Sequence, residues 1–279
     1  DADAVNGTVV RGFTFRNGSA GKANANTSGG GGAVCFNKDS GVVYVKDCAA
    51  VDCAAYSGGG FRGVVAIRSM VKKCRSADGS ALWGCKAYNC LFVENGQPNN
   101  YNEEVLKGDG PYVNCTAVAN NGSLMRETSA QRMYNSLSVL PSRQEFTTSN
   151  CGGDYNVVSF GAGVGTGKQE HSRQISSDAL LFAVMVAPMT GDYRPVAGGR
   201  LAGHGKRECL SFAFIPEDYR MRDFNGDPIA EDAPVPIGAL LPEGVPASAG
   251  LCLSSPMRLN GGDSAYAYHC HYTDVWPRQ

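Results

Sequence analysis

Basic and aromatic side chains recur two residues apart in this chain, and they are the residues whose types and spacing could do chemistry. Tyr44 pairs with Lys46, Lys86 with Tyr88 and Arg132 with Tyr134, while Lys72 stands two residues after Met70. In a strand, residues two apart face the same side of the sheet. Lysine and arginine bind carboxylate or sulfate groups, and aromatic faces stack on sugar rings. The candidate ligand-binding residues are therefore Tyr44, Lys46, Lys72, Lys86, Tyr88, Arg132 and Tyr134.

The simpler explanation is that strand exteriors favour tyrosine and tolerate lysine without any ligand. One basic side chain in each of several repeats nevertheless suits a linear anionic polymer better than a compact ligand. The predicted partner is accordingly an acidic glycan.

A short repeated phrase positions these side chains. A turn-forming or charged residue precedes a cysteine or serine, and a small apolar run follows. The five copies begin Lys46-Asp47-Cys48, Lys72-Lys73-Cys74, Tyr88-Asn89-Cys90, Val113-Asn114-Cys115 and Tyr134-Asn135-Ser136. The segment from Val9 to Phe15 fits the same frame, with Gly12 at the small position. A recurrence of this kind predicts a solenoid, propeller or array.

The segments between the phrases predict short strands with turns and no helix. Their β-branched and aromatic residues alternate with Gly, Asn, Asp and Ser clusters, and no helical apolar period interrupts them. Strands that repeat without helices can stack in parallel as the coils of a β-helix, so we expect an all-β solenoid. A leucine-rich repeat and a propeller lack their required patterns here. One interior column is expected to hold Gly12, Cys48, Cys74, Cys90, Cys115 and Ser136. Asparagines one residue earlier are expected to bond to each other along their own column.

Composition limits the classes of partner. The 279 residues carry 25 Lys and Arg against 26 Asp and Glu, so no global field attracts nucleic acid or a membrane surface. No apolar run is long enough to predict a membrane span. The chain opens at Asp1 directly onto a repeat without a cap. We therefore expect self-association, or an upstream capping segment, at the first coil.

Cysteine spacing gives no metal or redox motif. The chain has 11 cysteines and no CxxC pair, which argues against a zinc ribbon. The column cysteines are interpreted as small buried hydrophobes with reduced thiols. A bridge between Cys252 and Cys270 remains an open alternative.

Three further motifs are rejected as sites. The glycine run from Gly161 to Lys168 departs from a phosphate loop at Ala162 and Gln169. The segment from Asp223 to Asp227 lacks the glycine and glutamate of a calcium loop. His269 and His271 share a strand face but have no third ligand nearby. No metal or cofactor is predicted.

The phrases at residues 88–96 and 113–122 resemble coils of secreted bacterial right-handed parallel β-helix proteins of the pectate-lyase-like superfamily. Residues 178–195 resemble the closing coil of that family, and residues 223–228 with 236–239 resemble its ending. The resemblance implies an extracellular or cell-surface protein. It implies β-helix coils over residues 1–200, followed by a β-rich closing segment and tail over 201–279, which pack on the helix. Alternation at Ser264–Tyr272 predicts an appended strand in that tail.

Two functions remain open at this point. The first is an enzyme acting on an acidic polysaccharide by β-elimination, as a polysaccharide lyase. Lys72, Lys86 or Arg132 would neutralise the uronate carboxylate or remove the C5 proton, and Tyr88 or Tyr134 would be the acid. Hydrolysis is disfavoured because the predicted outer face carries no carboxylate pair. The second is a non-catalytic surface or structural protein that binds glycans or self-assembles. Both follow from the same fold, since fold alone does not determine activity.

Overall fold

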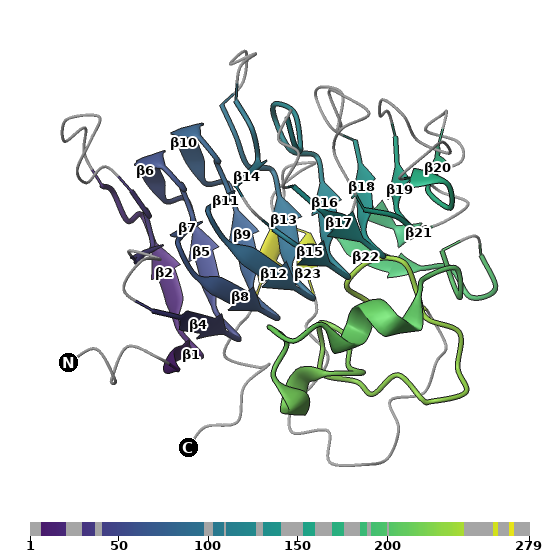
Figure 1. The fold of residues 1–279 in the computed structure, drawn as a ribbon. Helices are drawn as coiled ribbons and strands as arrows, with labels where there is room; N and C mark the ends of the chain where they lie inside the picture. Colours follow the sequence, from purple (N-terminus) through teal and green to yellow (C-terminus); the bar gives the residue numbers. More distant parts are fainter. Residues whose placement is uncertain are drawn as a thin grey trace.

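The computed structural model describes most of the first 242 residues. The described ranges are residues 7–20, 30–36, 41–97, 103–108, 110–126, 131–140, 153–159, 169–175, 185–188, 191–199 and 201–242, and the backbone of 259–261 and 268–270. Short strands stack in parallel from one end of the molecule to the other (Figure 1). The protein is an all-β parallel solenoid, as the sequence predicts.

Two long sheets form adjoining walls of the coils. The first sheet contains, in spatial order, β1 (Thr8–Arg11), β4 (Val43–Lys46), β8 (Val65–Ile67), β12 (Lys86–Tyr88), β15 (Tyr112–Val113) and β17 (Met133–Tyr134). The second contains β2 (Thr14–Arg16), β5 (Ala49–Val51), β9 (Met70–Lys72), β13 (Leu91–Val93), β16 (Thr116–Val118), β18 (Leu137–Val139), β19 (Val157–Val158) and β20 (Arg173–Gln174).

Shorter sheets complete the coils. The third sheet contains β3 (Val34–Cys35), β7 (Phe61–Arg62), β11 (Leu82–Trp83) and β14 (Leu106–Lys107), and β6 (Ala54–Ser57) pairs with β10 (Arg75–Asp78). Two antiparallel pairs follow in the chain: β21 (Met185–Ala187) with β22 (Asp192–Pro195), and β23 (Leu259–Gly261) with β24 (Tyr268–Cys270). The strand predicted at Ser264–Tyr272 is present at Tyr268–Cys270, and the rest of that prediction lies outside the described residues.

A residue in the left-handed conformation turns the chain from the first sheet to the second in each coil. Asp47, Arg68, Asn89, Asn114 and Asn135 have φ angles of 56°, 45°, 52°, 51° and 48°. Asparagine and aspartate tolerate this conformation best among residues with a side chain. The second sheet ends in the same way, at Asp52, Lys73, Glu94, Ala119 and Leu140. Each coil therefore has two corners with the same local geometry.

The residue after the first corner points inward, and in several coils it bonds to the backbone of the coil before it. Cys90 Sγ donates to Tyr88 O at 3.4 Å and to Ala66 O of the preceding coil at 3.5 Å. Ser69 makes the equivalent bonds from its hydroxyl and accepts one from Cys48 N at 3.1 Å. Buried backbone groups need such partners. A small side chain with one donor meets that requirement and fits the corner.

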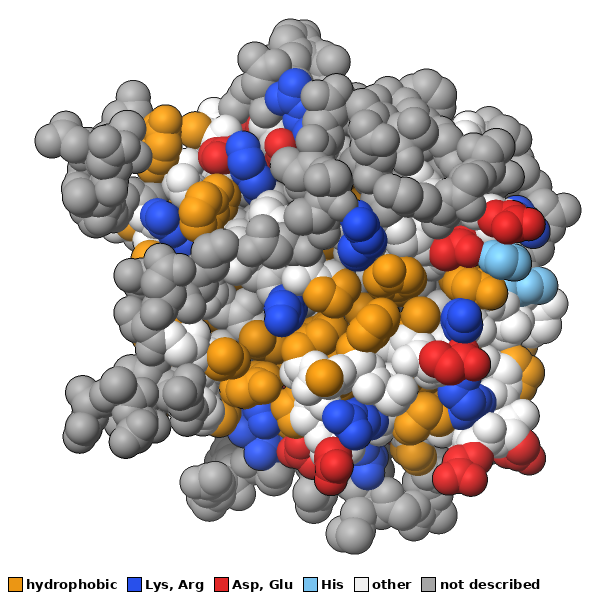
Figure 2. All heavy atoms as spheres, viewed as in Figure 1, with side chains coloured by type: hydrophobic (Ala, Val, Ile, Leu, Met, Phe, Trp, Pro, Cys, Tyr) orange, Lys and Arg blue, Asp and Glu red, His pale blue; other side chains and the backbone are white. Residues whose placement is uncertain are grey.

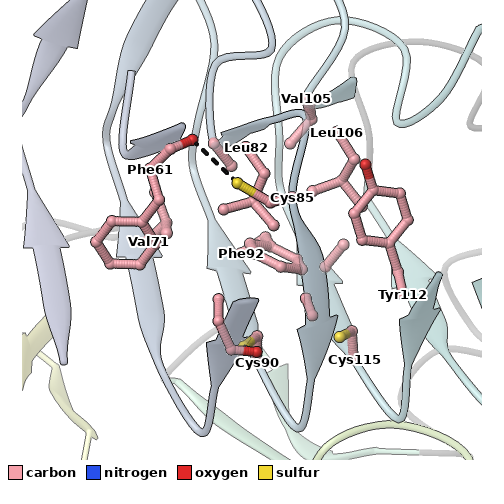
Figure 3. Close-up of a cluster of buried hydrophobic side chains, with 14 of the residues drawn as sticks. Phe61, Val71, Leu82, Cys85, Cys90, Phe92, Val105, Leu106, Tyr112 and Cys115 are labelled. Atoms are coloured by element: carbon pink, nitrogen blue, oxygen red, sulfur yellow. Dashed lines mark hydrogen bonds between the residues drawn. The ribbon is translucent and has the colours of Figure 1, made fainter. Parts of the chain in front are cut away.

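The interior between the sheets is apolar (Figure 3). Phe61, Leu82 and Leu106 enter it from the third sheet, and Phe92 enters from the second. All four side chains are fully buried. Burying one such side chain contributes about 1.5–3 kcal/mol, so the stacked interior is the main source of stability.

The register that the sequence predicts is wrong at one coil. Val45 pairs with Ala66, and Ala66 pairs with Ala87, so Ser69 lies between Cys48 and Cys90 in the interior column. Cys74 instead follows the second corner, where its nearest equivalent is Cys53. The two corners demand the same residue types, and the short phrase does not distinguish them. The places predicted for Cys48, Cys90, Cys115 and Ser136 agree with the structure.

The segment of residues 201–242 lies against the outside of the coils and is called the cover below (Figure 1). It consists of turns with two 3-10 helices, η4 (Arg207–Ser211) and η5 (Glu217–Tyr219). In the described part of the chain, no helix is both long and apolar enough to cross a membrane.

Candidate functional site

The outer face of the first sheet carries two rows of side chains. One row consists of Tyr44, Val65, Lys86, Pro111 and Arg132. It is called the exposed row, because only Val65 in it is buried and Lys86 is exposed. The other, called the covered row, consists of Lys46, Ile67, Tyr88, Val113 and Tyr134. Both rows follow from the parallel register, because equivalent positions of successive coils stack directly.

The cover buries the middle of the covered row. Ile67, Tyr88 and Val113 pack against Leu210, Ile215, Tyr219, Ile229 and Val235. Tyr88 is fully buried, and its hydroxyl donates to Arg222 O at 3.3 Å. Burial raises the pKa of Tyr88 well above its ordinary value. Tyr88 is therefore not available to a ligand in this conformation.

Two asparagines at the first corner, Asn89 and Asn135, bind the cover and not each other. Asn135 Oδ1 accepts from Lys206 N at 2.7 Å, and its Nδ2 donates to Lys206 O at 2.7 Å. Asn89 Nδ2 donates to Arg222 O. The prediction that these asparagines bond along their column is wrong, because their left-handed backbone directs them outward against the cover. An asparagine pair bonded between coils does exist at the second corner, where Asn95 Nδ2 donates to Asn120 Oδ1 at 3.1 Å.

A buried charge cluster holds the cover at the first coils. Asp47 is fully buried and accepts from Arg11 Nε and Arg68 Nε, both at 2.8 Å. The Tyr219 hydroxyl of the cover donates to the same carboxylate at 2.7 Å. Three charge-assisted donors compensate the buried carboxylate. The cluster therefore ties η5 to the coils.

The structure brings six of the seven predicted site residues onto one face, five of them at least partly accessible. Tyr44, Lys46, Lys86, Arg132 and Tyr134 lie on the outer side of the first sheet, and Lys86 is the most exposed of them. Tyr88 lies on the same face but is buried.

Lys72 lies elsewhere, in β9 of the second sheet, and it is 4% exposed. The same register error that misplaced Cys74 misplaced Lys72. The coil that takes its place on the first sheet carries Val65 and Ile67, so the predicted basic side chain is absent from that coil. Whether a ligand binds this face stays a prediction.

Aromatic side chains of the cover extend the accessible part of this face. Phe212 lies 5.4 Å from the Tyr134 ring and 6.2 Å from Phe214, measured between ring centroids. Lys86 Nζ lies 5.8 Å from the centre of the Phe214 ring. The exposed row and these rings together are called the outer band. Figure 2 shows it as a strip of hydrophobic side chains over the first sheet, with basic groups along its margin.

An aspartate–histidine pair stands at the end of the outer band nearest the last coils. Val157 pairs with Arg173, and Asn135 N donates to Asp154 O, so Asp154 follows Tyr134 in the covered row. The residues at the first corner of successive coils are called the corner column. By the same register, Tyr155 and then His171 follow Asn135 in this column. Acidic and histidine side chains are visible at this end of the strip in Figure 2.

The pair has a short and well-supported hydrogen bond. His171 Nδ1 lies 2.6 Å from Asp154 Oδ2, and the His171 ring stacks on Tyr155 at 4.6 Å with an interplanar angle of 1°. Burial alone would raise the pKa of Asp154, but hydrogen bonds from His171 and from backbone N–H groups hold that pKa below its ordinary value. The carboxylate is therefore ionised next to the imidazole.

Sequence reasoning missed this pair. The available signal was Asp154-Tyr155-Asn156 followed by Val157-Val158, which has the same order of strand end, corner and small polar residue as Tyr134-Asn135-Ser136. Asn156 confirms the equivalence, because its Oδ1 accepts from Ser136 N at 3.1 Å.

In the part of the chain that the structure describes, no group of three or more His, Cys, Asp or Glu side chains could hold a metal ion. The glycine run at 161–168 and the pair His269 and His271 lie outside the residues whose side chains are described. No protein-family model, curated protein or solved structure matches this chain.

Proposed function

We propose that the protein binds an acidic polysaccharide along the outer band. The observation that carries the proposal is the placement of Lys86 and Arg132 in one row, with Pro111 between them and the rings of Phe212, Phe214 and Tyr134 beside them. Two strand spacings, about 10 Å, separate the backbones of Lys86 and Arg132. An extended anionic chain can contact both while its sugar faces lie on the apolar surface.

The charge of the two rows supports an anionic ligand. From Tyr44 to Tyr134 neither row contains an aspartate or glutamate in the described strands. The nearest carboxylate of the corner column, Asp47, is engaged by two arginines and Tyr219. The rows therefore present cations without a competing exposed carboxylate, and paired-carboxylate hydrolysis has no support there.

We also propose that the protein is extracellular or lies at the cell surface, and that it is related to secreted β-helix proteins of the pectate-lyase-like superfamily. Their support is the resemblance of the coils at residues 88–96 and 113–122.

The test is retention on immobilised polygalacturonate, alginate and hyaluronate at low salt, with neutral dextran as the reference matrix. Wild-type protein should bind at least one acidic matrix and elute as salt rises, since exposed charge pairs are screened. Lys86→Ala or Arg132→Ala alone should cost about 1 kcal/mol or less, and the double variant should lose retention. Arg75→Ala is the matched control, because Arg75 is an exposed cation on β10, away from the outer band. Equal retention of the double variant and the control would reject the site.

The second candidate is a non-catalytic protein that assembles through its first coil. Strands β1 and β2 are the first members of their sheets, and each pairs with one described strand only. Val9 and Phe13 beside them are 47% and 58% exposed. Unpaired backbone groups on a strand edge, next to apolar side chains, favour association. Sedimentation of wild type and Phe13→Ser across a concentration series distinguishes this candidate, since only assembly through this end predicts a mass that falls in the variant.

A further inference from the structure

We propose that Cys53 and Cys74 form a two-thiolate site that holds one Cu(I) ion between neighbouring coils. Both residues follow the second corner, Cys53 after β5 and Cys74 after β9. Their side chains belong to the apolar interior, whereas the outer band lies on the outside of the first sheet. The inference is therefore independent of glycan binding.

The two thiols have equivalent environments, one coil apart. Cys53 Sγ donates to the carbonyl two residues before it at 3.4 Å, and to Phe15 O of the preceding coil at 3.6 Å. Cys74 Sγ bonds in the same way, at 3.5 Å to the carbonyl two residues before it and at 3.6 Å to Ala50 O. Phe15 pairs with Ala50 in the sheet. The two side chains are therefore parallel and related by one coil.

This arrangement suits a metal ion better than a disulfide. Equivalent atoms of stacked coils lie about 4.8 Å apart. A disulfide needs sulfur atoms about 2.05 Å apart on side chains directed at each other, and parallel side chains do not meet that condition. A metal–thiolate bond is about 2.3 Å long, so an ion in line between two thiolates holds their sulfur atoms about 4.6 Å apart. The column thus presents two sulfur ligands at the separation that linear coordination requires.

The number and type of ligands select the ion. Thiolates favour soft cations such as Cu(I), and Cu(I) accepts two ligands in a linear arrangement. The neighbours of the pair in its column are Gly18 and Asn95, and neither supplies a third sulfur. Structural Zn²⁺ requires four ligands. Among the described residues, no group of three or more His, Cys, Asp or Glu side chains could provide them.

A hydrogen bond between the two thiols already joins the ligands. This bond lowers the pKa of Cys53, while burial raises the pKa of Cys74 well above its ordinary value. Metal ligands must be deprotonated, so binding releases both thiol protons to solvent. Two Cu–S bonds replace the hydrogen bond between the thiols. The metal enters and stays as Cu(I), and no electron is transferred.

Entry to the site is through the first coil. Gly18 precedes Cys53 in the column, and a Cβ added to it would lie 3.4 Å from Cys53 Sγ. Any side chain at Gly18 would collide with Gly32 O, so only backbone covers the thiol from this side. Gly18 is itself partly exposed. Among the described strands, those of the first coil pair with one neighbour only, and such ends open locally most readily.

A second stacked pair, Cys90 with Cys115, provides the matched control. It lies in the interior column after the first corner (Figure 3), where the two thiols also share a hydrogen bond. Ser69 precedes this pair and Ser136 follows it, so further coils enclose it on both sides. The same chemistry is present there without a path for the ion.

The alternative is that Cys53 and Cys74 are only small buried side chains with weak donors. It predicts the same Cu(I) affinity for Cys53→Ser, Cys74→Ser and Cys90→Ser. Serine keeps the shape of the side chain and a donor, and circular dichroism verifies that each variant is folded.

The first experiment is anaerobic titration of the reduced protein with Cu(I) in competition with bicinchoninate. Wild type and Cys90→Ser should withdraw one equivalent of Cu(I) from the chelator. Loss of an outer-shell partner already costs about 10–100-fold in metal affinity, so Cys53→Ser and Cys74→Ser should each lose more than about 100-fold. X-ray absorption of the complex with one equivalent should show two sulfur neighbours at copper.

The second experiment needs no variant. One equivalent of Cu(I) should slow the alkylation of Cys53 and Cys74 in the native wild-type protein, measured by mass spectrometry. Alkylation of Cys35, an exposed free thiol, should keep its rate. The inference is overturned if wild type withdraws no Cu(I), if Cys53→Ser and Cys90→Ser bind equally well, or if Cu(I) leaves the alkylation of Cys53 unchanged.

Discussion

Replacing Asp47 by asparagine should show how strongly the buried charge cluster holds the cover. Asparagine keeps the size of the side chain and tolerates the φ of 56° at this corner, so the substitution removes the charge with little backbone strain. Arg11 and Arg68 then lose their anionic acceptor, and Tyr219 loses a charge-assisted bond. The Arg68 side chain is only 12% exposed, so its cation stays largely desolvated after it loses this carboxylate.

Removing one partner of a buried ion pair costs about 3–5 kcal/mol. Arg11 is 61% exposed and can return to water, which places the expected loss near the lower limit, at about 3 kcal/mol. For a chain of this size that corresponds to a fall in Tm of roughly 6–12 °C. Tyr219→Phe removes a single bond to the carboxylate and should cost about 1.5–3 kcal/mol.

The assay is calorimetric or urea unfolding of both variants, of the double variant, and of Asp52→Asn. Asp52 has the same left-handed conformation, with φ of 53°, at an exposed corner, so its substitution should change stability by less than about 0.5 kcal/mol. The double variant should lose less than the sum of the single losses, because both act on one network. A loss in Asp47→Asn no larger than in Asp52→Asn would refute the role of the cluster.

Three further predictions concern the interior and the cover. Cys90→Ser should be tolerated within about 1 kcal/mol because Ser69 and Ser136 occupy the same column, whereas Cys90→Ala should cost more, since the side-chain bonds to two carbonyls are lost; urea unfolding compares them, and a more stable alanine variant would contradict a stabilising role of these bonds. Titration of the denatured, unreduced protein should find at least eight free thiols, the eight free cysteines of the described residues, and a count of three or fewer would mean that these are bridged. Burial raises the pKa of Asp223 to about 7, so the folded state holds a proton that the unfolded state, with an ordinary pKa near 3.9, releases. This group's contribution to stability should therefore fall as pH rises from about 4 to 7, and Asp223→Asn should lack that fall; an identical pH dependence in the variant would exclude Asp223 as its source.

Particular residues show how far sequence reasoning reaches. The recurring cysteines and asparagines predicted a parallel solenoid correctly. Each corner of a stacked coil requires a residue that tolerates the left-handed conformation, followed by a small side chain that points inward. Cys74 and Lys72 were misplaced because the two corners of one coil impose the same demand, and only pairing between distant strands separates them.

Burial of Tyr88 could not be predicted from the strand pattern. Alternation places a side chain on the outside of the sheet but does not tell whether another segment covers it. The cover consists of residues 201–242, more than a hundred positions after Tyr88 in the sequence, and its turns have no periodicity. Asp154 and His171 were missed for the same reason, since separate coils bring them together.

Protection of Lys86 from acetylation by a bound glycan tests the central claim most directly. Lys86 is exposed in the outer band, and Lys73, 40% exposed at the second corner, is the internal reference within the same molecule. Mass spectrometry of the two lysines, labelled with and without polygalacturonate, alginate or hyaluronate, should show slower acetylation of Lys86 and an unchanged rate at Lys73. An equal rate at Lys86 in the presence of a glycan that the protein retains would contradict binding at the outer band.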